Sequence, residues 1–180
     1  MHMATDTKQW TLDEVHSLPD DGNRYELVRG QLFVTPPPTD PHETIAARLS
    51  HLLFAYVERE KLGYVYRPQA VMRFEGSEVE PDLMVRQPNP SAEPTWDNAP
   101  VPILVVEILS PSTRRRDQVQ KRSLYMDAGV AEYWMIDDER RTITSVRQGQ
   151  DDVIAREQLV WNPAGVSAPF ILEVARVFKD

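Results

Sequence analysis

The sequence predicts a mixed α/β fold in which helices pack on a central sheet. Short strand-like runs dominate the chain, and two stronger helical patterns interrupt them, one before residue 60 and one after residue 113. The expected order is a short helix, a hairpin, a long helix, strands, one more helix and further strands. This order is typical of one mixed sheet with flanking helices, and 180 residues suffice for one such domain.

The N-terminal segment carries the pattern of a short helix. Thr11 is followed three residues later by Glu14, a capping box that predicts a helix running to about Ser17. Proline, aspartate and glycine are concentrated at residues 19–22, which predicts a turn. We expect residues 1–23 to pack on the same domain as the rest of the chain.

Residues 24–180 are expected to form a single domain that begins with a hairpin. Apolar residues alternate in Arg24–Arg29 and Gln31–Thr35 on either side of one glycine, which predicts a tight β-hairpin. A proline run then leads to Pro41–Arg59, where apolar residues recur at helical spacing over nearly five turns. This segment predicts the strongest helix of the chain.

The second half of the chain alternates strands with one helix. Gly63–Phe74 and Glu78–Val85 each predict a strand, and residues 87–100 predict a loop because they hold four prolines and no periodicity. Arg114–Ala128 predicts a helix that ends at a glycine. The additional strands expected toward the C-terminus are Glu132–Asp137, a hairpin of Arg141–Arg147 with Val153–Val160, and Ala168–Ile171.

The strand expected at Val101–Leu109 contains one carboxylate, Glu107, within an otherwise apolar run. Burial of an ionised carboxylate without a partner costs several kcal/mol, so an arginine, a backbone amide or a cation must satisfy it. A right-handed crossover to Glu132–Asp137 would make the two strands parallel. Glu107 would then lie near the carboxyl end of a strand, where ligands bind α/β sheets.

Asp82 is a second acidic residue in a strand-like run. Taken alone it could be an edge-strand or turn residue, and Glu80, two residues earlier, could be a third ligand or a surface charge. If the strands that carry Asp82 and Glu107 are neighbours, their carboxylates converge, and a divalent cation would offset the repulsion. Mg²⁺ or Mn²⁺ is the expected ion because both take oxygen ligands.

Further candidates lie on the two longer helices. Asp117, Lys121 and Tyr125 are spaced to share one helix face. Lys121 either forms a surface ion pair with Asp117 or places an ammonium near the metal, where it would position a water or stabilise a phosphate. At the start of the long helix, His42, next to Glu43, could be a metal ligand, a phosphate contact or an interfacial residue.

Composition excludes several other classes of site. The chain has no cysteine, so it forms no disulfide or thiolate metal site, and its histidines lack zinc-ligand spacing. It has no glycine-rich phosphate loop, and Ser110 and Ser112 have no nearby histidine, which argues against a serine hydrolase. No run is long enough to span a membrane and no signal-peptide pattern is present, so we expect a cytoplasmic protein.

The net charge of −8 argues against a protein that coats nucleic acid non-specifically. One basic cluster stands out, Arg114–Arg116 followed by Lys121 and Arg122. It is either a solvated helix start or a set of contacts to backbone phosphates. A homodimer is expected on general grounds, because most soluble oligomers are two-fold symmetric dimers.

Several of these segments together resemble the Uma2 family, formerly a domain of unknown function, in the PD-(D/E)XK restriction-endonuclease-like superfamily. The resemblance covers roughly Arg24 to Phe178. It rests on Arg24–Gly30, the proline-rich step to His42, Glu80–Leu83, Val105–Ser112, Asp117, Lys121 and Tyr125–Asp137.

The resemblance implies a restriction-endonuclease-like core and a metal-dependent nuclease, a hydrolase of phosphodiester bonds in DNA rather than RNA. It assigns Asp82 and Glu107 as the catalytic ligands of Mg²⁺ or Mn²⁺. The lysine that the superfamily places two residues after this glutamate is Leu109 here, and Lys121 matches the lysine that Uma2 proteins carry on the next helix. Many such nucleases have a glutamate on the first helix, for which Glu43 is a candidate and Glu26 in the hairpin an alternative.

The acidic surface and the missing Glu-x-Lys pattern are compatible with a second function. The chain would then be a non-catalytic interaction or regulatory protein that retains the nuclease fold. The retention of Asp82, Glu107 and Lys121 together favours the enzyme.

Overall fold

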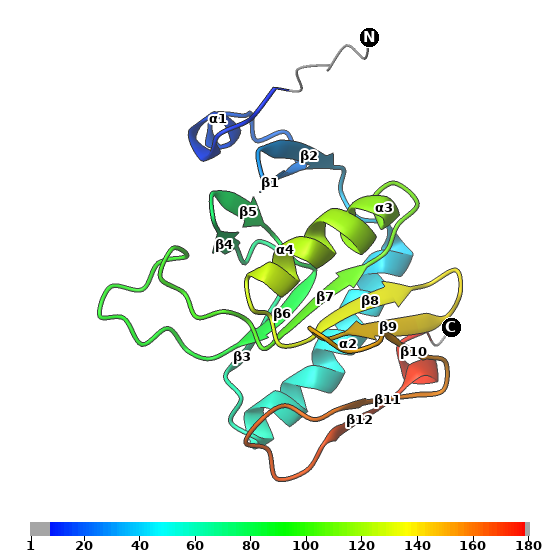
Figure 1. The fold of residues 1–180 in the computed structure, drawn as a ribbon. Coiled ribbons are helices and arrows are strands. Elements are labelled where there is room, and N and C mark those ends of the chain that lie inside the picture. Colours follow the sequence, from blue (N-terminus) through cyan, green and yellow to red (C-terminus); the bar gives the residue numbers. More distant parts are fainter. Residues whose placement is uncertain (1–7, 179–180) are drawn as a thin grey trace.

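A computed structural model describes residues 8–178 of the chain (Figure 1). Near the N-terminus it contains helix α1 (Leu12–His16), whose first turn is closed by the reciprocal hydrogen bonds of Thr11 and Glu14 that the capping box predicts. The hairpin of β1 (Arg24–Val28) and β2 (Gln31–Thr35) follows, with Val28 paired to Gln31 across the turn. Both predictions for this region are confirmed.

A six-stranded mixed sheet forms the centre of the molecule, in the order β10-β9-β8-β7-β6-β3. Its central strands β7 and β8 are parallel, and Glu107 pairs with Met135 across them, as the predicted crossover requires. The strands are β3 (Tyr64–Tyr66), β6 (Leu83–Arg86), β7 (Leu104–Ile108), β8 (Tyr133–Asp137), β9 (Thr142–Val146) and β10 (Val153–Ala155).

A second, smaller sheet in the order β2-β1-β5-β4 includes β4 (Met72–Phe74) and β5 (Ser77–Val79). The prediction of single strands at Gly63–Phe74 and Glu78–Val85 is therefore wrong. Each segment is two short strands in different sheets, because Pro68 and Pro81 have no N–H for a ladder and interrupt the pairing. Asp82 consequently lies where the chain crosses from one sheet to the other.

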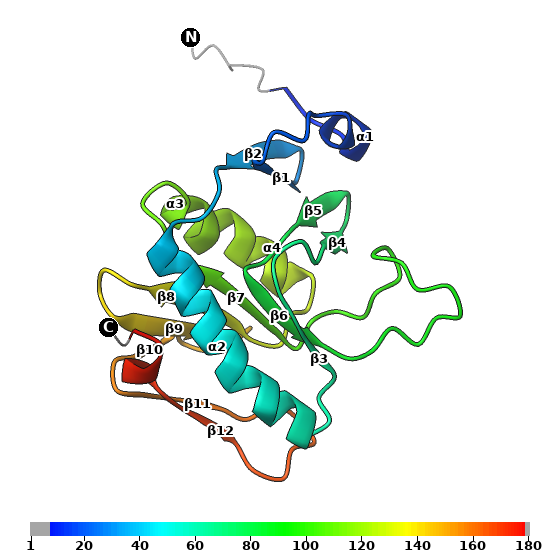
Figure 2. The same ribbon diagram turned by 180° about the vertical axis from the view of Figure 1, so that it is seen from behind.

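Helices cover both faces of the six-stranded sheet. Helix α2 (Asp40–Arg59) runs across one face, as Figure 2 shows from behind, and its buried residues pack with Leu104, Val106 and Ile108 of β7. On the other face, Val105 packs with residues of the helical segment that follows β7. Glu107 alternates with the α2-facing residues and so points to this second face.

The helix predicted at Arg114–Ala128 is not regular. It consists of α3 (Arg114–Arg116), a π-helical turn at Asp117–Lys121, and α4 (Arg122–Asp127). A π turn inserts one extra residue into the helix and changes the direction of the side chains around it. Here both ends of the π turn, Asp117 and Lys121, are buried.

The C-terminal strands also differ from the prediction at one point. Strands β9 and β10 form the expected hairpin, but the run expected at Val153–Val160 divides into β10 and β11 (Gln158–Trp161). Strand β11 pairs instead with β12 (Phe170–Glu173), and a 3-10 turn at Val174–Arg176 follows. No helix in the described part of the chain is long and apolar enough to cross a membrane.

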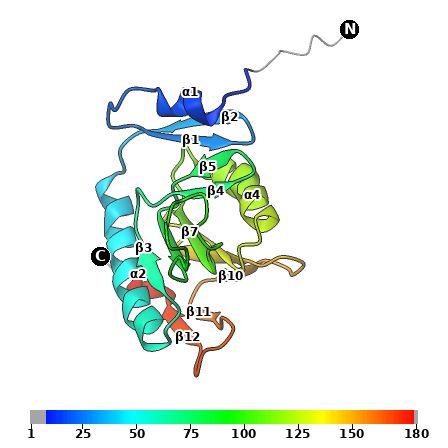
Figure 3. The same cartoon turned by 90° about the vertical axis from the view of Figure 1, so that its left-hand side faces the viewer.

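Figure 3 shows the layers from the side, with α1 and the β1–β2 hairpin stacked above the end of the central sheet. Helix α1 contacts β1, and β1 pairs with β5 of the smaller sheet. Residues 1–7 of the expected N-terminal segment and residues 179–180 of the expected domain lie outside the described residues.

Candidate active site

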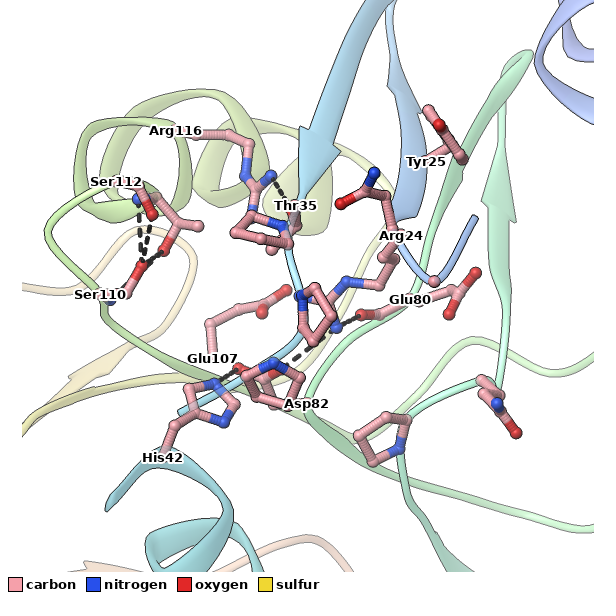
Figure 4. Close-up of a pocket in the computed structure, with 18 of the residues that line it drawn as sticks. Arg24, Tyr25, Thr35, His42, Glu80, Asp82, Glu107, Ser110, Ser112 and Arg116 are labelled. Carbon is pink, nitrogen blue, oxygen red and sulfur yellow. Dashed lines mark hydrogen bonds and ion pairs between the residues drawn. The ribbon is translucent and has the colours of Figure 1, made fainter. Parts of the chain in front are cut away.

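A cavity of about 560 Å³ lies where the smaller sheet meets the carboxyl end of β7. Both acidic residues that the sequence singled out, Asp82 and Glu107, line it (Figure 4). Asp82 directly precedes β6, Glu107 lies in β7, and the two strands are neighbours in the sheet, with Leu83 opposite Val106. The condition that led us to expect a shared site, adjacency of the two strands, is therefore met.

Asp82 is buried and each of its carboxylate oxygens has a protein donor. Its Oδ2 accepts from the backbone N–H of Ile108 at 2.8 Å and lies 3.1 Å from Nε2 of His42, while Oδ1 accepts from Arg24 at 3.2 Å. Burial would raise the pKa of Asp82, but the hydrogen bond with His42 and the charge of Arg24 hold it well below its usual range. Asp82 is therefore ionised.

Glu107 is 1% exposed, and its Oε1 atom receives two strong donors. Nζ of Lys121 lies 2.7 Å away and the hydroxyl of Tyr125 donates over 2.5 Å. Burial raises the pKa of Glu107 to about 7 despite the ammonium of Lys121, and the nearby charge of Asp82 adds to the rise. Glu107 is thus short of compensating positive charge.

Lys121 bridges two acidic residues. Its Nζ lies 2.6 Å from Oε1 of Glu26 as well as 2.7 Å from Glu107, and its side chain is fully buried. Burial would lower the pKa of Lys121, but the carboxylates of Glu107 and Glu26 raise it, so the group is an ammonium. The alternative of a surface ion pair with Asp117 is wrong, because Asp117 is buried and accepts from Arg116.

The accessory candidates occupy different depths of the site. Glu26 is at its centre, fully buried, and also accepts from the backbone N–H of Glu80 at 2.9 Å. Glu43 lies at the edge of the cavity with its side chain 44% exposed, so the contact from the long helix to Asp82 is made by His42. The half-buried side chain of Glu80 lines the cavity, and burial raises its pKa.

The three arginines predicted to contact phosphates have different surroundings. Arg114 binds Asp137 and Glu139, and Arg116 is 7% exposed and held by Glu26, Asp117 and Thr35. Of the three, Arg115 is the one with an exposed side chain. Arg116 is therefore bonded within the site, whereas the side chain of Arg115 is exposed to solution.

Sequence reasoning missed Arg24, which bonds to Asp82 and to the backbone carbonyl of Glu80 at 2.9 Å. A signal was present, because Arg24 and Glu26 lie two residues apart in a strand and so face the same side. Figure 4 shows Arg24 reaching from β1 toward Asp82. The site therefore depends on the hairpin as much as on the central sheet.

The donor set of this centre fits Mg²⁺ or Mn²⁺. Mg²⁺ commonly takes one or two carboxylates, completed by waters and phosphate oxygens, and Asp82 with Glu107 supplies two. Within residues 8–178 no group of three acidic, histidine or cysteine side chains is arranged to hold a metal, so the site has no third such ligand.

The fold is shared with a solved structure. A protein described as "a putative nuclease belonging to DUF820 from Anabaena variabilis ATCC 29413" superposes with a TM-score of 0.78 at 22% sequence identity, over 94% of this chain and 97% of that one. The comparison with functionally curated proteins gave no match.

A family model described as "Uma2: Putative restriction endonuclease" matches residues 12–174, which is most of the chain and includes α1 and every residue of the candidate site. The expected mixed sheet with flanking helices, N-terminal hairpin and additional C-terminal strands is confirmed by the structure. The resemblance inferred from the sequence is also confirmed, and the chain belongs to the Uma2 family.

Proposed function

We propose that this protein is a metal-dependent endonuclease that hydrolyses phosphodiester bonds in DNA. The observation that carries the proposal is the meeting of Asp82 and Glu107 in one cavity, with the Lys121 ammonium bonded to Glu107. Membership of a family described as a putative restriction endonuclease supports the same class of reaction. Mg²⁺ or Mn²⁺ would be held by Asp82 and Glu107, and the ion would lower the pKa of a bound water.

The residues around the two acids prepare them for this role. Arg24 and His42 orient Asp82 from opposite oxygens, and the backbone of Ile108 fixes it against β7. Tyr125 and Lys121 fix Glu107 in the same way from the helix face. Since Lys121 is fully buried, we propose that it acts through Glu107 as a positioning residue and does not touch the phosphate.

Three finer points stay predictions. DNA is preferred to RNA as the substrate, the protein acts as a homodimer, and it is cytoplasmic. Arg115 is the arginine of its cluster that we expect to contact a backbone phosphate, because its side chain is exposed.

One observation favours the second candidate, a non-catalytic interaction protein. Both oxygens of Asp82 already have protein donors, so this acid is satisfied by Arg24, His42 and Ile108 without a cation. Glu107 argues for the enzyme, because burial raises the pKa of this carboxyl group and a cation in the cavity would stabilise its charged form.

The proposed activity is tested with a 5′-labelled single-stranded DNA and a duplex of the same sequence, each incubated with the protein in Mn²⁺, in Mg²⁺ and in EDTA. We expect internal cleavage of at least one of the two DNAs in the presence of either ion and no cleavage in EDTA. Absence of cleavage of both DNAs under all conditions would contradict the enzyme and favour the interaction protein.

A further inference from the structure

The cavity itself limits what can reach the two acids. Its volume of about 560 Å³ lies in the range of roughly 300–1,000 Å³ typical of small-molecule pockets. A cube of this volume is only about 8 Å on a side, whereas the major groove of B-DNA alone is about 12 Å wide. An intact duplex therefore cannot enter the cavity that Asp82 and Glu107 line.

The cavity is closed on the side of the N-terminal segment. Its walls include the end of α1 at Val15 and His16, most of residues 18–25, and the proline run at residues 36–38. Figure 4 shows Arg24 and Thr35, from the β1–β2 hairpin, on the same side of the cavity as one another and beside the two acids. Because these segments wall the cavity on this side, they restrict access to the acids and favour a thin strand over a wide helix.

The charges of the residues that line the cavity limit how many phosphate groups of the substrate it can accept. Two arginines line the cavity, Arg24 and Arg116, and both are already bonded to buried carboxylates. A chain of many phosphates needs many free cations, so few phosphates can be accommodated. The carboxylates lining the cavity are Asp20, Glu43, Glu78, Glu80, Asp82, Glu107 and Asp117.

The remaining walls suit a nucleobase. Five prolines and Tyr25 supply rigid apolar surface, and Asn23 and Gln69 supply amides. Unpaired bases are recognised by stacking and by hydrogen bonds to edges that pairing would hide. The side-chain amide of Gln69 has no hydrogen-bond partner within residues 8–178, so it is free to bind such an edge.

We propose that the cavity takes a single unpaired nucleotide, so that the substrate is single-stranded DNA or an unpaired stretch of it, and not an intact duplex. The inference rests on the proposed function, because it is the phosphate of this nucleotide that would reach Asp82 and Glu107. The inference adds to that function a place for the base of the nucleotide, at the cavity wall that includes Gln69.

Binding can be measured apart from cleavage. A fluorescein-labelled single-stranded 12-mer and a covalently closed duplex of the same sequence are titrated with the protein in Ca²⁺, and fluorescence anisotropy is recorded. We expect at least tenfold tighter binding of the single strand. Equal or tighter binding of the closed duplex, or no binding of either, would overturn the inference. If the protein binds the single strand more tightly but does not cleave it in Mn²⁺, the proposed hydrolysis would be overturned and the preference for a single strand would be kept.

The role of Gln69 is tested by Gln69→Ala, with Gln148→Ala as the control at an exposed glutamine outside the cavity. We expect Gln69→Ala to weaken binding of the single strand about fivefold and to leave Mn²⁺ affinity unchanged. Unchanged single-strand affinity would remove Gln69 from the nucleotide site, and equal weakening by Gln148→Ala would show that the effect is not local.

Discussion

Replacing Lys121 with methionine is expected to lower the free energy of unfolding by about 3–5 kcal/mol, because it leaves two buried carboxylates without their shared cation. Glu26 and Glu107 are 0% and 1% exposed and lie within 2.7 Å of its ammonium. Urea denaturation followed by circular dichroism measures the change. Lys61→Met removes an exposed ammonium instead and should change stability little.

A second variant distinguishes the loss of the buried ion pairs from a simple packing defect as the cause of this destabilisation. In the double variant Lys121→Met/Glu107→Gln, one of the two unpaired charges is removed, so the protein should be more stable than Lys121→Met alone. A loss below about 1 kcal/mol for Lys121→Met, the value typical of exposed pairs, would contradict the buried bridge.

The second large effect is expected on catalysis. Glu107→Gln keeps the shape of the side chain and an oxygen that can accept from Tyr125, but it removes the charge that would hold the metal. We expect DNA cleavage in Mn²⁺ to fall at least about a thousandfold, which corresponds to about 4 kcal/mol of transition-state stabilisation. Initial rates on the single-stranded substrate measure this loss.

The matched control is Glu58→Gln, which neutralises an exposed glutamate on α2 away from the cavity. Its rate should equal that of the wild type. A Glu107→Gln protein that is folded and cleaves within tenfold of the wild type would remove Glu107 from the catalytic centre.

The sequence alone singled out Glu107 and the two helix residues that contact it. Glu107 is detectable because it interrupts an apolar strand, and an isolated charge in such a run requires a partner. The helix face of Lys121 and Tyr125 follows from their four-residue spacing, and both side chains do meet Glu107. These features depend on local periodicity, which a sequence displays directly.

The remaining parts of the site depend on contacts between distant segments. Arg24 and Asp82 are 58 residues apart, and Glu26 reaches Lys121 only because the hairpin folds over the end of the central sheet. No local pattern predicts that Glu78–Val85 divides between two sheets or that a π turn interrupts the helix beginning at Arg114. Tertiary packing decides these points.

The central claim, a shared metal site at Asp82 and Glu107, is tested most directly by calorimetric titration with Mn²⁺. The wild type is compared with the Asp82→Ala/Glu107→Ala variant, and circular dichroism confirms that both are folded. We predict saturable binding of Mn²⁺ by the wild type and its loss in the variant. Equal heats from the two proteins, whether both bind or neither does, would contradict the account.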